Sequence, residues 1–200
     1  VDNFHVGSND VKYIKWFFTT QMGGIKFVKE NSQSVLGVHV EHPEKGVYTF
    51  SMEFYILKLA DRFKIVDKRP LIKVPITTQA VEKLLKLPRK ITVDTSIPMM
   101  ELVMSLFWLG RNVRYDILFA CIFYATFSHC YNQEVFDECL NVLYYLLNTL
   151  DAKLVYRDNG IKESCDIKIV VDASYGKFPV GCAMVYLNGC LIHFGIERNK

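Results

Sequence analysis

Asp172 lies directly after a predicted strand, a position at which a carboxylate could bind a metal ion. Asp172 follows the apolar run Ile167–Val171, whose β-branched residues predict a strand, so the carboxylate is expected at the end of that strand. Mg²⁺ prefers such oxygen ligands, and cleavage of a phosphodiester by two metal ions about 3.5–4 Å apart requires several of them. If no further ligands lie nearby, the simpler interpretation is that Asp172 is only a polar residue that ends a buried strand.

A second feature that could do chemistry is a segment of positive charge. Ten lysines and arginines but only three acids lie between Lys58 and Lys90, so this segment carries +7 in a chain of net charge +3. Contact with a phosphate backbone requires only positive charge at suitable spacing. The alternative is a solvated helix face and loop. The candidates for weak, sequence-independent binding of nucleic acid are Lys83, Lys86, Arg89 and Lys90.

Cysteine and histidine spacing predicts no metal site. The six cysteines include no Cys-x-x-Cys pair and no zinc-like spacing with the five histidines. The first residues lack a basic region followed by an apolar stretch, and the longest apolar run, Ile117–Phe127, is too short to cross a bilayer. We therefore expect an intracellular protein, cytoplasmic or nuclear and not secreted, with no membrane partner. Its cysteines are expected to be free thiols that fill the core.

The elements that must position these residues begin with a hairpin and helices. A β-hairpin is predicted over 38–52, because Val38 and Val40 alternate with polar residues and turn residues follow at 43–46. Apolar spacing then predicts helices within the stretches 54–63, 93–112, 115–130 and 132–150. Arg114 and Asp116, two apart, would lie on different faces of a helix, so each is expected to pair with another residue.

The last part of the chain has a different pattern. A polar linker is predicted over 156–166, and three short apolar runs follow it. Asn188-Gly189, a two-residue hairpin turn, joins the second run to the third. Three strands alone leave one face of a sheet uncovered, so we expect that the chain ends inside a domain or needs a partner to cover it. The predicted strands are Ile167–Val171, Val180–Leu187 and Cys190–Ile196.

These segments, in this order, resemble the C-terminal part of the polymerase of copia-type long-terminal-repeat retrotransposons, in which a reverse transcriptase runs through helices into ribonuclease H. VLGVHVEH resembles the family's Leu-Gly-Ile-Glu-Ile stretch, and RNVRYDILFACIFYA resembles its Thr-Arg-Pro-Asp-Ile-x-x-Ala motif. YLLNTLDAKLVY resembles its Tyr-Leu-Lys-Gly-Thr-x-Asp-x-Gly-Leu-x-Tyr stretch. YILKLADRFKIVDKRPLIKVPIT resembles its helix and Asp-Lys-Pro-like linker, and DASYGKFPVGCAMVYLNGCLIHF resembles the opening of its ribonuclease H domain.

The resemblance implies an α+β chain of three parts. Residues 1–53 match the end of the reverse transcriptase palm with its β-hairpin, and residues 54–160 match the thumb or connection helices. Residues 161–200 match the N-terminal strands of a truncated ribonuclease H-like domain with a three-stranded sheet. The intact parent is an RNA-directed DNA polymerase that uses Mg²⁺ and cleaves RNA/DNA hybrids. Its partners are RNA/DNA hybrid or duplex nucleic acid and the remainder of the polyprotein.

The resemblance also assigns the catalytic carboxylates and implies that they are incomplete. Asp2 takes the place of the first aspartate of the Tyr-x-Asp-Asp hairpin, and Asn3 replaces the second. Asp172 matches the first ribonuclease H aspartate, which makes it a vestigial metal ligand. The family's glutamate lies on a later helix, whereas the acid that follows Asp172 here is Glu197, near a strand end. We therefore expect a chain that binds no Mg²⁺ and is inactive; the alternatives are a non-catalytic nucleic-acid- or polyprotein-binding remnant, and a decayed reading frame without a role.

Overall fold

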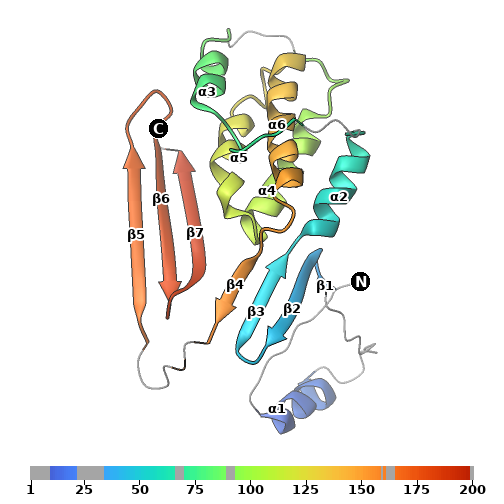
Figure 1. The fold of residues 1–200 in the computed structure, drawn as a ribbon, viewed down its shortest axis with the longest axis vertical. Helices are drawn as coiled ribbons and strands as arrows, with labels where there is room; N and C mark the ends of the chain where they lie inside the picture. Colours follow the sequence, from blue (N-terminus) through green and yellow to red (C-terminus); the bar gives the residue numbers. More distant parts are fainter. Residues whose placement is uncertain are drawn as a thin grey trace.

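The computed structural model describes residues 10–21, 34–65, 70–88, 93–158, 160 and 165–198. It is an α+β structure in which a helical bundle lies next to two antiparallel sheets (Figure 1). The helices are α1 (Val11–Trp16), α2 (Glu53–Arg62), α3 (Thr78–Leu85), α4 (Met99–Asn112), α5 (Leu118–Ala125) and α6 (Gln133–Asn148). The strands are β1 (Ser34–Val35), β2 (Val38–Glu44), β3 (Val47–Ser51), β4 (Leu154–Arg157), β5 (Ile167–Ser174), β6 (Val180–Leu187) and β7 (Cys190–Arg198).

The first sheet has the order β1-β2-β3-β4 and contains the predicted hairpin. Strands β2 and β3 pair antiparallel around the turn Lys45-Gly46, where Gly46 takes a φ of +79°, so this prediction is confirmed. Strand β4 pairs with the other side of β3, with Phe50 opposite Leu154. The predicted linker over 156–166 is therefore wrong at its start, because its first two residues belong to β4.

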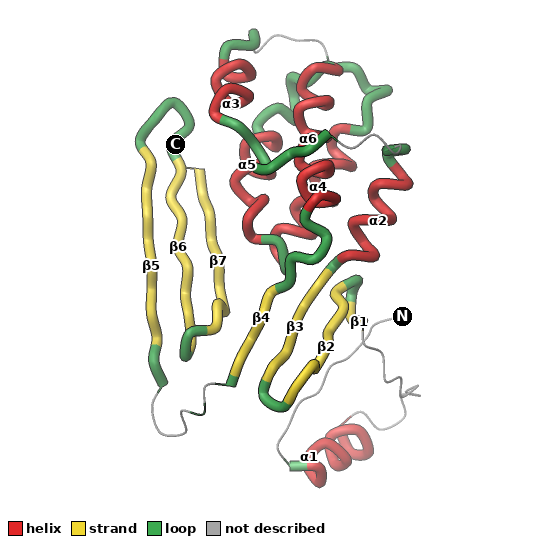
Figure 2. The backbone as a smooth tube through the Cα atoms, in the orientation of Figure 1, coloured by secondary structure: helices red, strands yellow, loops and turns green. Residues whose placement is uncertain are grey.

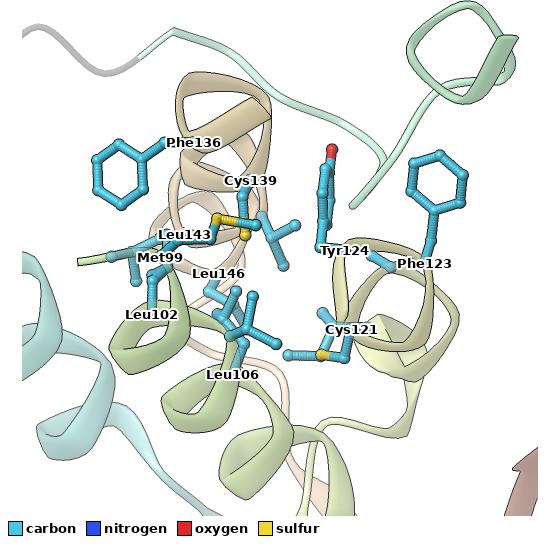
Figure 3. Close-up of a cluster of buried hydrophobic side chains, with 14 of the residues drawn as sticks. Met99, Leu102, Leu106, Cys121, Phe123, Tyr124, Phe136, Cys139, Leu143 and Leu146 are labelled. Carbon is cyan, nitrogen blue, oxygen red and sulfur yellow. The ribbon is translucent and has the colours of Figure 1, made fainter. Parts of the chain in front are cut away.

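The core lies where α4, α5 and α6 meet (Figure 3). The spacing of apolar residues in the sequence correctly predicted the buried face of α4, where Leu102, Leu106 and Leu109 are fully buried. Helix α6 begins at Asn132, whose side chain accepts a hydrogen bond from the backbone N–H of Val135 at 3.1 Å. The apolar spacing that predicted a helix within 132–150 corresponds to a buried stripe on α6, which consists of Val135, Phe136, Cys139, Leu143, Leu146 and Leu147.

Two helical features differ from the prediction. The stretch 115–130 is not one helix, because a 3-10 turn over Tyr115–Ile117 precedes α5 and the helix ends at Ala125. Helix α3 was not predicted at all. Its start is capped by the Thr77 hydroxyl, which accepts a hydrogen bond from the N–H of Ala80 at 3.1 Å, and its buried side is short.

The second sheet has the order β5-β6-β7 and contains the predicted Asn188-Gly189 hairpin turn. Both turn residues have positive φ, +50° and +81°, as a type I′ turn requires. One face of the sheet packs on the bundle, where the Phe194 ring lies 5.7 Å from the Tyr115 ring and Val180 contacts the core. Strand β5 is longer than predicted and exposed along most of its length, so the expectation of a buried strand is wrong.

The cysteines are free thiols, but only some of them fill the core. Cys121, Cys130 and Cys139 are buried as expected, whereas Cys165 is exposed and the other two are half-buried. Burial raises the pKa of Cys121 to about 12, so this thiol stays protonated and unreactive at neutral pH. Within the part of the chain that the structure describes, no helix is both long and apolar enough to cross a membrane.

Candidate functional site

Asp172 lies inside β5, two residues before its end. It stands opposite Cys182 of β6, which in turn stands opposite Ile196 of β7. Residues directly opposite one another in an antiparallel sheet point to the same face, so these three side chains share a face. The Asp172 carboxylate is exposed, and its Oδ1 accepts a hydrogen bond from the N–H of Ala173 at 2.9 Å. The prediction that Asp172 ends its strand is wrong.

Glu197 points away from Asp172. Its partner across the sheet is Gly181, which pairs on its other side with Ala173. Because successive residues of a strand point to opposite faces, Glu197 and Asp172 lie on opposite faces of the second sheet. Among the described residues, no group of three histidine, cysteine, aspartate or glutamate side chains is arranged to hold a metal ion. The two carboxylates therefore cannot share one.

Several predicted site residues lie outside the described part of the chain. These are Asp2 and Asn3, which the resemblance assigns to the polymerase hairpin, and Arg89 and Lys90 of the basic segment. The described candidates for phosphate contact are Lys83 and Lys86.

Lys83 is engaged in two ion pairs. Its Nζ lies 3.0 Å from Glu134 Oε1 and 3.3 Å from Glu138 Oε1, and it thereby connects α3 to α6. The hydrogen bonds to Glu134 and then to Glu138 raise the pKa of Lys83. Two carboxylates face one ammonium group, so the local charge is negative and unfavourable for a phosphate. Lys86, one position beyond α3, is exposed.

Arg114, whose side chain is 4% exposed, and Asp116, whose side chain is 38% exposed, form a polar cluster with Tyr145 and Thr149. The prediction of separate partners is wrong, because Arg114 precedes the 3-10 turn in a non-helical conformation and donates two hydrogen bonds to Asp116, Nε–Oδ1 at 3.0 Å and Nη2–Oδ2 at 2.8 Å. Its guanidinium also donates to the Thr149 carbonyl oxygen at 3.0 Å and hydroxyl at 2.7 Å. The Tyr145 hydroxyl donates to Asp116 Oδ2 at 2.8 Å. The cluster fastens the start of α5 to the end of α6.

The Arg114–Asp116 pair makes stability depend on pH. Burial alone would raise the pKa of Asp116, but the hydrogen bonds and charge of Arg114, with the Tyr145 hydroxyl, hold it below the usual value of 3.8. A carboxyl group whose pKa is lower in the folded state stabilises the fold above the unfolded pKa of about 3.9, and this contribution is lost as pH falls through the folded value.

Asp116→Asn is therefore expected to lower the free energy of unfolding by about 1 kcal/mol at neutral pH, discounted for the solvent that reaches the carboxylate, and by much less at pH 3. Urea titrations of both proteins at the two pH values measure this difference. Asp151→Asn, an exposed acid just after α6, is the matched control. A loss of stability that is equal at both pH values would contradict the ionic role of Asp116.

Two hollows lie beside the first sheet. One of about 380 Å³ is lined by Tyr48, Phe50, Asn112, Leu154 and Tyr156. It was missed in the sequence because it forms only when β4 pairs with β3. Tyr156 also donates a hydrogen bond to the Leu191 carbonyl at 2.5 Å, which connects the two sheets. The lining is almost entirely apolar and holds no carboxylate, so it offers no acid–base chemistry.

The second hollow, of about 210 Å³, lies where β1 and β2 meet the start of α2. Its lining includes Lys58, His39 and Phe54, of which Phe54 is 72% exposed. The His39 and Phe54 rings meet edge to face with centroids 6.2 Å apart. A cation beside an exposed aromatic ring can contact a phosphate and a base, the combination used to bind single-stranded nucleic acids.

No family model matches the chain, and no solved structure matches it.

Proposed function

We propose that this chain is a part of the reverse transcriptase and ribonuclease H region of a copia-type retrotransposon polyprotein, and that by itself it catalyses neither reaction. The order of its elements supports the proposal. The β2–β3 hairpin leads into α2, further helices follow, and three antiparallel strands come last. This is the order that the resemblance implies for the palm, the thumb or connection, and the opening of ribonuclease H. The proposed location is the cytoplasm or the nucleus.

The observation that carries the second half of the proposal is the orientation of Asp172. It lies on the first strand of the second sheet, where the resemblance puts a metal ligand, but Glu197 points to the opposite face. A two-metal mechanism requires several carboxylates around both ions, and one carboxylate cannot hold them. The parent polymerase uses Mg²⁺, and we propose that this chain does not; among the described residues no three histidine, cysteine, aspartate or glutamate side chains are grouped to hold a metal ion, which supports this part of the proposal.

We expect no cleavage when the purified chain is incubated with a labelled RNA/DNA hybrid and Mg²⁺ and the products are separated on a gel. Asp172→Ala is expected to behave identically, because its carboxylate has no metal to hold. An active ribonuclease H in the same buffer serves as the positive control. Cleavage by the chain that disappears in Asp172→Ala would show that a complete metal site forms, and would overturn the catalytic half of the proposal.

A second candidate function is weak binding of nucleic acid, and the hollow beside α2 favours it over the basic residues of α3. Lys58 lies there with the exposed Phe54 ring, whereas Lys83 is held by two carboxylates. Binding of the hybrid in the same samples, measured by fluorescence anisotropy across a salt series, distinguishes the two places. Lys58→Glu is expected to weaken binding and to lower the slope against log salt by about 1, the loss of one phosphate contact.

The matched control is Lys45→Glu, the same charge change at the turn of the β2–β3 hairpin. It is expected to leave both affinity and salt slope unchanged. An equal loss in both variants would mean that only net charge matters and that the hollow is not the binding place. Absence of binding by the folded chain would leave a remnant without a nucleic-acid function.

A further inference from the structure

Strand β5 is an open edge of the second sheet. Within the described part of the chain it pairs with β6 alone, and Figure 2 shows no described element along its other side. Ile167, Ile169 and Val171 are 60%, 64% and 71% exposed. An open edge of this kind presents unpaired backbone N–H and C=O groups that a further strand can use.

The backbone of β5 shows which residues face that open edge. The N–H of Asn188 donates to the Asp166 carbonyl at 2.7 Å, so the backbone groups of Asp166 point toward β6. In an antiparallel strand the direction alternates from residue to residue. The backbone groups of Lys168, Val170 and Asp172 therefore also point to β6, and those of the odd-numbered residues from Ile167 onward point to the open edge.

The side chains of β5 are self-complementary about Val170. Lys168 and Asp172 lie two residues before and two residues after it, on one face of the strand, and both are exposed. If a second copy pairs antiparallel with Val170 opposite its own counterpart, each Lys168 stands opposite an Asp172. In that register Ile169 stands opposite Val171, so residues with edge-facing backbone groups meet each other and can exchange hydrogen bonds.

We propose that β5 is a self-association edge, through which two copies of this chain join their second sheets into one continuous six-stranded sheet. The arrangement is a two-fold, isologous interface. The two β7 strands lie at the outer edges of the joined sheet, five strand spacings or about 24 Å apart. Helix α5 contacts β7, so the two bundles lie at these outer edges. The edge-facing N–H groups of Ile169 and Val171 gain partners, whereas the N–H of Ala173 already donates to Asp172 Oδ1. The opposite charges select this register over its neighbours.

The interface is small, because a strand of eight residues is about 27 Å long. It is below the size of a standard stable interface, so the expected dissociation constant is micromolar or weaker. Sedimentation velocity over a concentration series that extends to several hundred micromolar, without nucleic acid or Mg²⁺, measures it directly. Asp172 enters both arguments, but this experiment measures association alone, without cleavage or binding of nucleic acid, so the failure of self-association and that of the proposed function are separate results.

Charge reversal tests the register. Lys168→Asp replaces two attractive cross-strand pairs with two like-charge pairs, and we expect association to weaken about 10- to 30-fold. Asp172→Lys is expected to do the same. The double variant Lys168→Asp/Asp172→Lys restores opposite charges at both positions, and it should return the dissociation constant to within a few-fold of the original. Lys177→Asp, an exposed loop position just after β5, is the matched control and should change nothing.

Each outcome decides the proposal. A monomer at every concentration overturns it, and so does a dimer that withstands both single reversals, because such a dimer forms without the Lys168–Asp172 pairs. If association weakens in both single variants and does not recover in the double variant, the two charges lie at the interface, but the register with Val170 opposite its own counterpart is rejected. Both positions are exposed, and either reversal alone carries the test if the other variant fails to fold, which circular dichroism checks.

Discussion

Arg114→Ala is expected to lower the free energy of unfolding by about 3 kcal/mol at neutral pH. The Arg114 side chain is only 4% exposed, and it satisfies the Asp116 carboxylate together with the carbonyl and hydroxyl of Thr149. Its removal takes the Arg114 donors away from both oxygens of Thr149 and leaves the Asp116 carboxylate with the Tyr145 hydroxyl but without its charged partner, at the junction of α5 and α6. The value lies at the low end of the range for a broken buried pair, because solvent reaches the carboxylate. Urea unfolding followed by circular dichroism measures it.

The matched control is Arg111→Ala, which removes the same side chain from an exposed position in the last turn of α4. It is expected to change stability by less than about 0.5 kcal/mol. Arg114→Lys keeps the charge but loses the planar fork that contacts Asp116 at two points, so its loss is expected to be intermediate. If Arg114→Ala costs no more than Arg111→Ala, the cluster does not contribute to stability.

The sequence predicted the helices well where a long apolar stripe has no competing interpretation. Helix α6, of sixteen residues, carries one apolar stripe, and this stripe is buried in the structure. The hairpin turns were equally predictable from the sequence. They require backbone conformations with positive φ that few residues other than glycine and asparagine adopt, and Gly46 and Asn188-Gly189 supply them. In these places local chemistry and the final packing agree.

The elements that the sequence did not predict depend on distant partners. Strand β4 has four residues, too few for a periodic signal, and it forms because β3 offers an unpaired side about a hundred residues earlier in the chain. The Arg114–Asp116 pair was misjudged for a similar reason. Spacing rules for helices do not apply to Arg114, whose φ of −101° and ψ of 62° place it between two helical segments.

The candidate site shows the same limit. A strand around Asp172 could be predicted, but the face to which its carboxylate points relative to Glu197 depends on the pairing register of three strands. Charge counting also overstated Lys83 as a phosphate contact, because Glu134 and Glu138 come close only when α3 packs on α6. A one-dimensional charge pattern gives the sign of a segment but not which of its charges are already paired.

Leu106→Ala is expected to lower the free energy of unfolding by about 3 kcal/mol, through lost burial and the cavity left behind. Leu106 is fully buried, and Figure 3 shows it on α4 among side chains of α5 and α6, including Cys121 and Leu146. A cavity at this meeting point weakens all three helices together, so the buried thiols should become accessible more often. We expect alkylation of Cys121 and Cys139 to accelerate roughly a hundredfold when labelling follows the opening equilibrium.

The comparison with Met104→Ala isolates the effect of burial, because Met104 lies on the same helix and is 59% exposed. That variant should change stability by less than about 0.5 kcal/mol and leave the labelling of Cys121 and Cys139 unchanged. The exposed Cys165 provides an internal rate standard in every protein, since its labelling does not require opening of the bundle. If Leu106→Ala accelerates Cys121 but not Cys139, the contact between α4 and α5 opens separately from α6, and the three helices are not one cooperative unit.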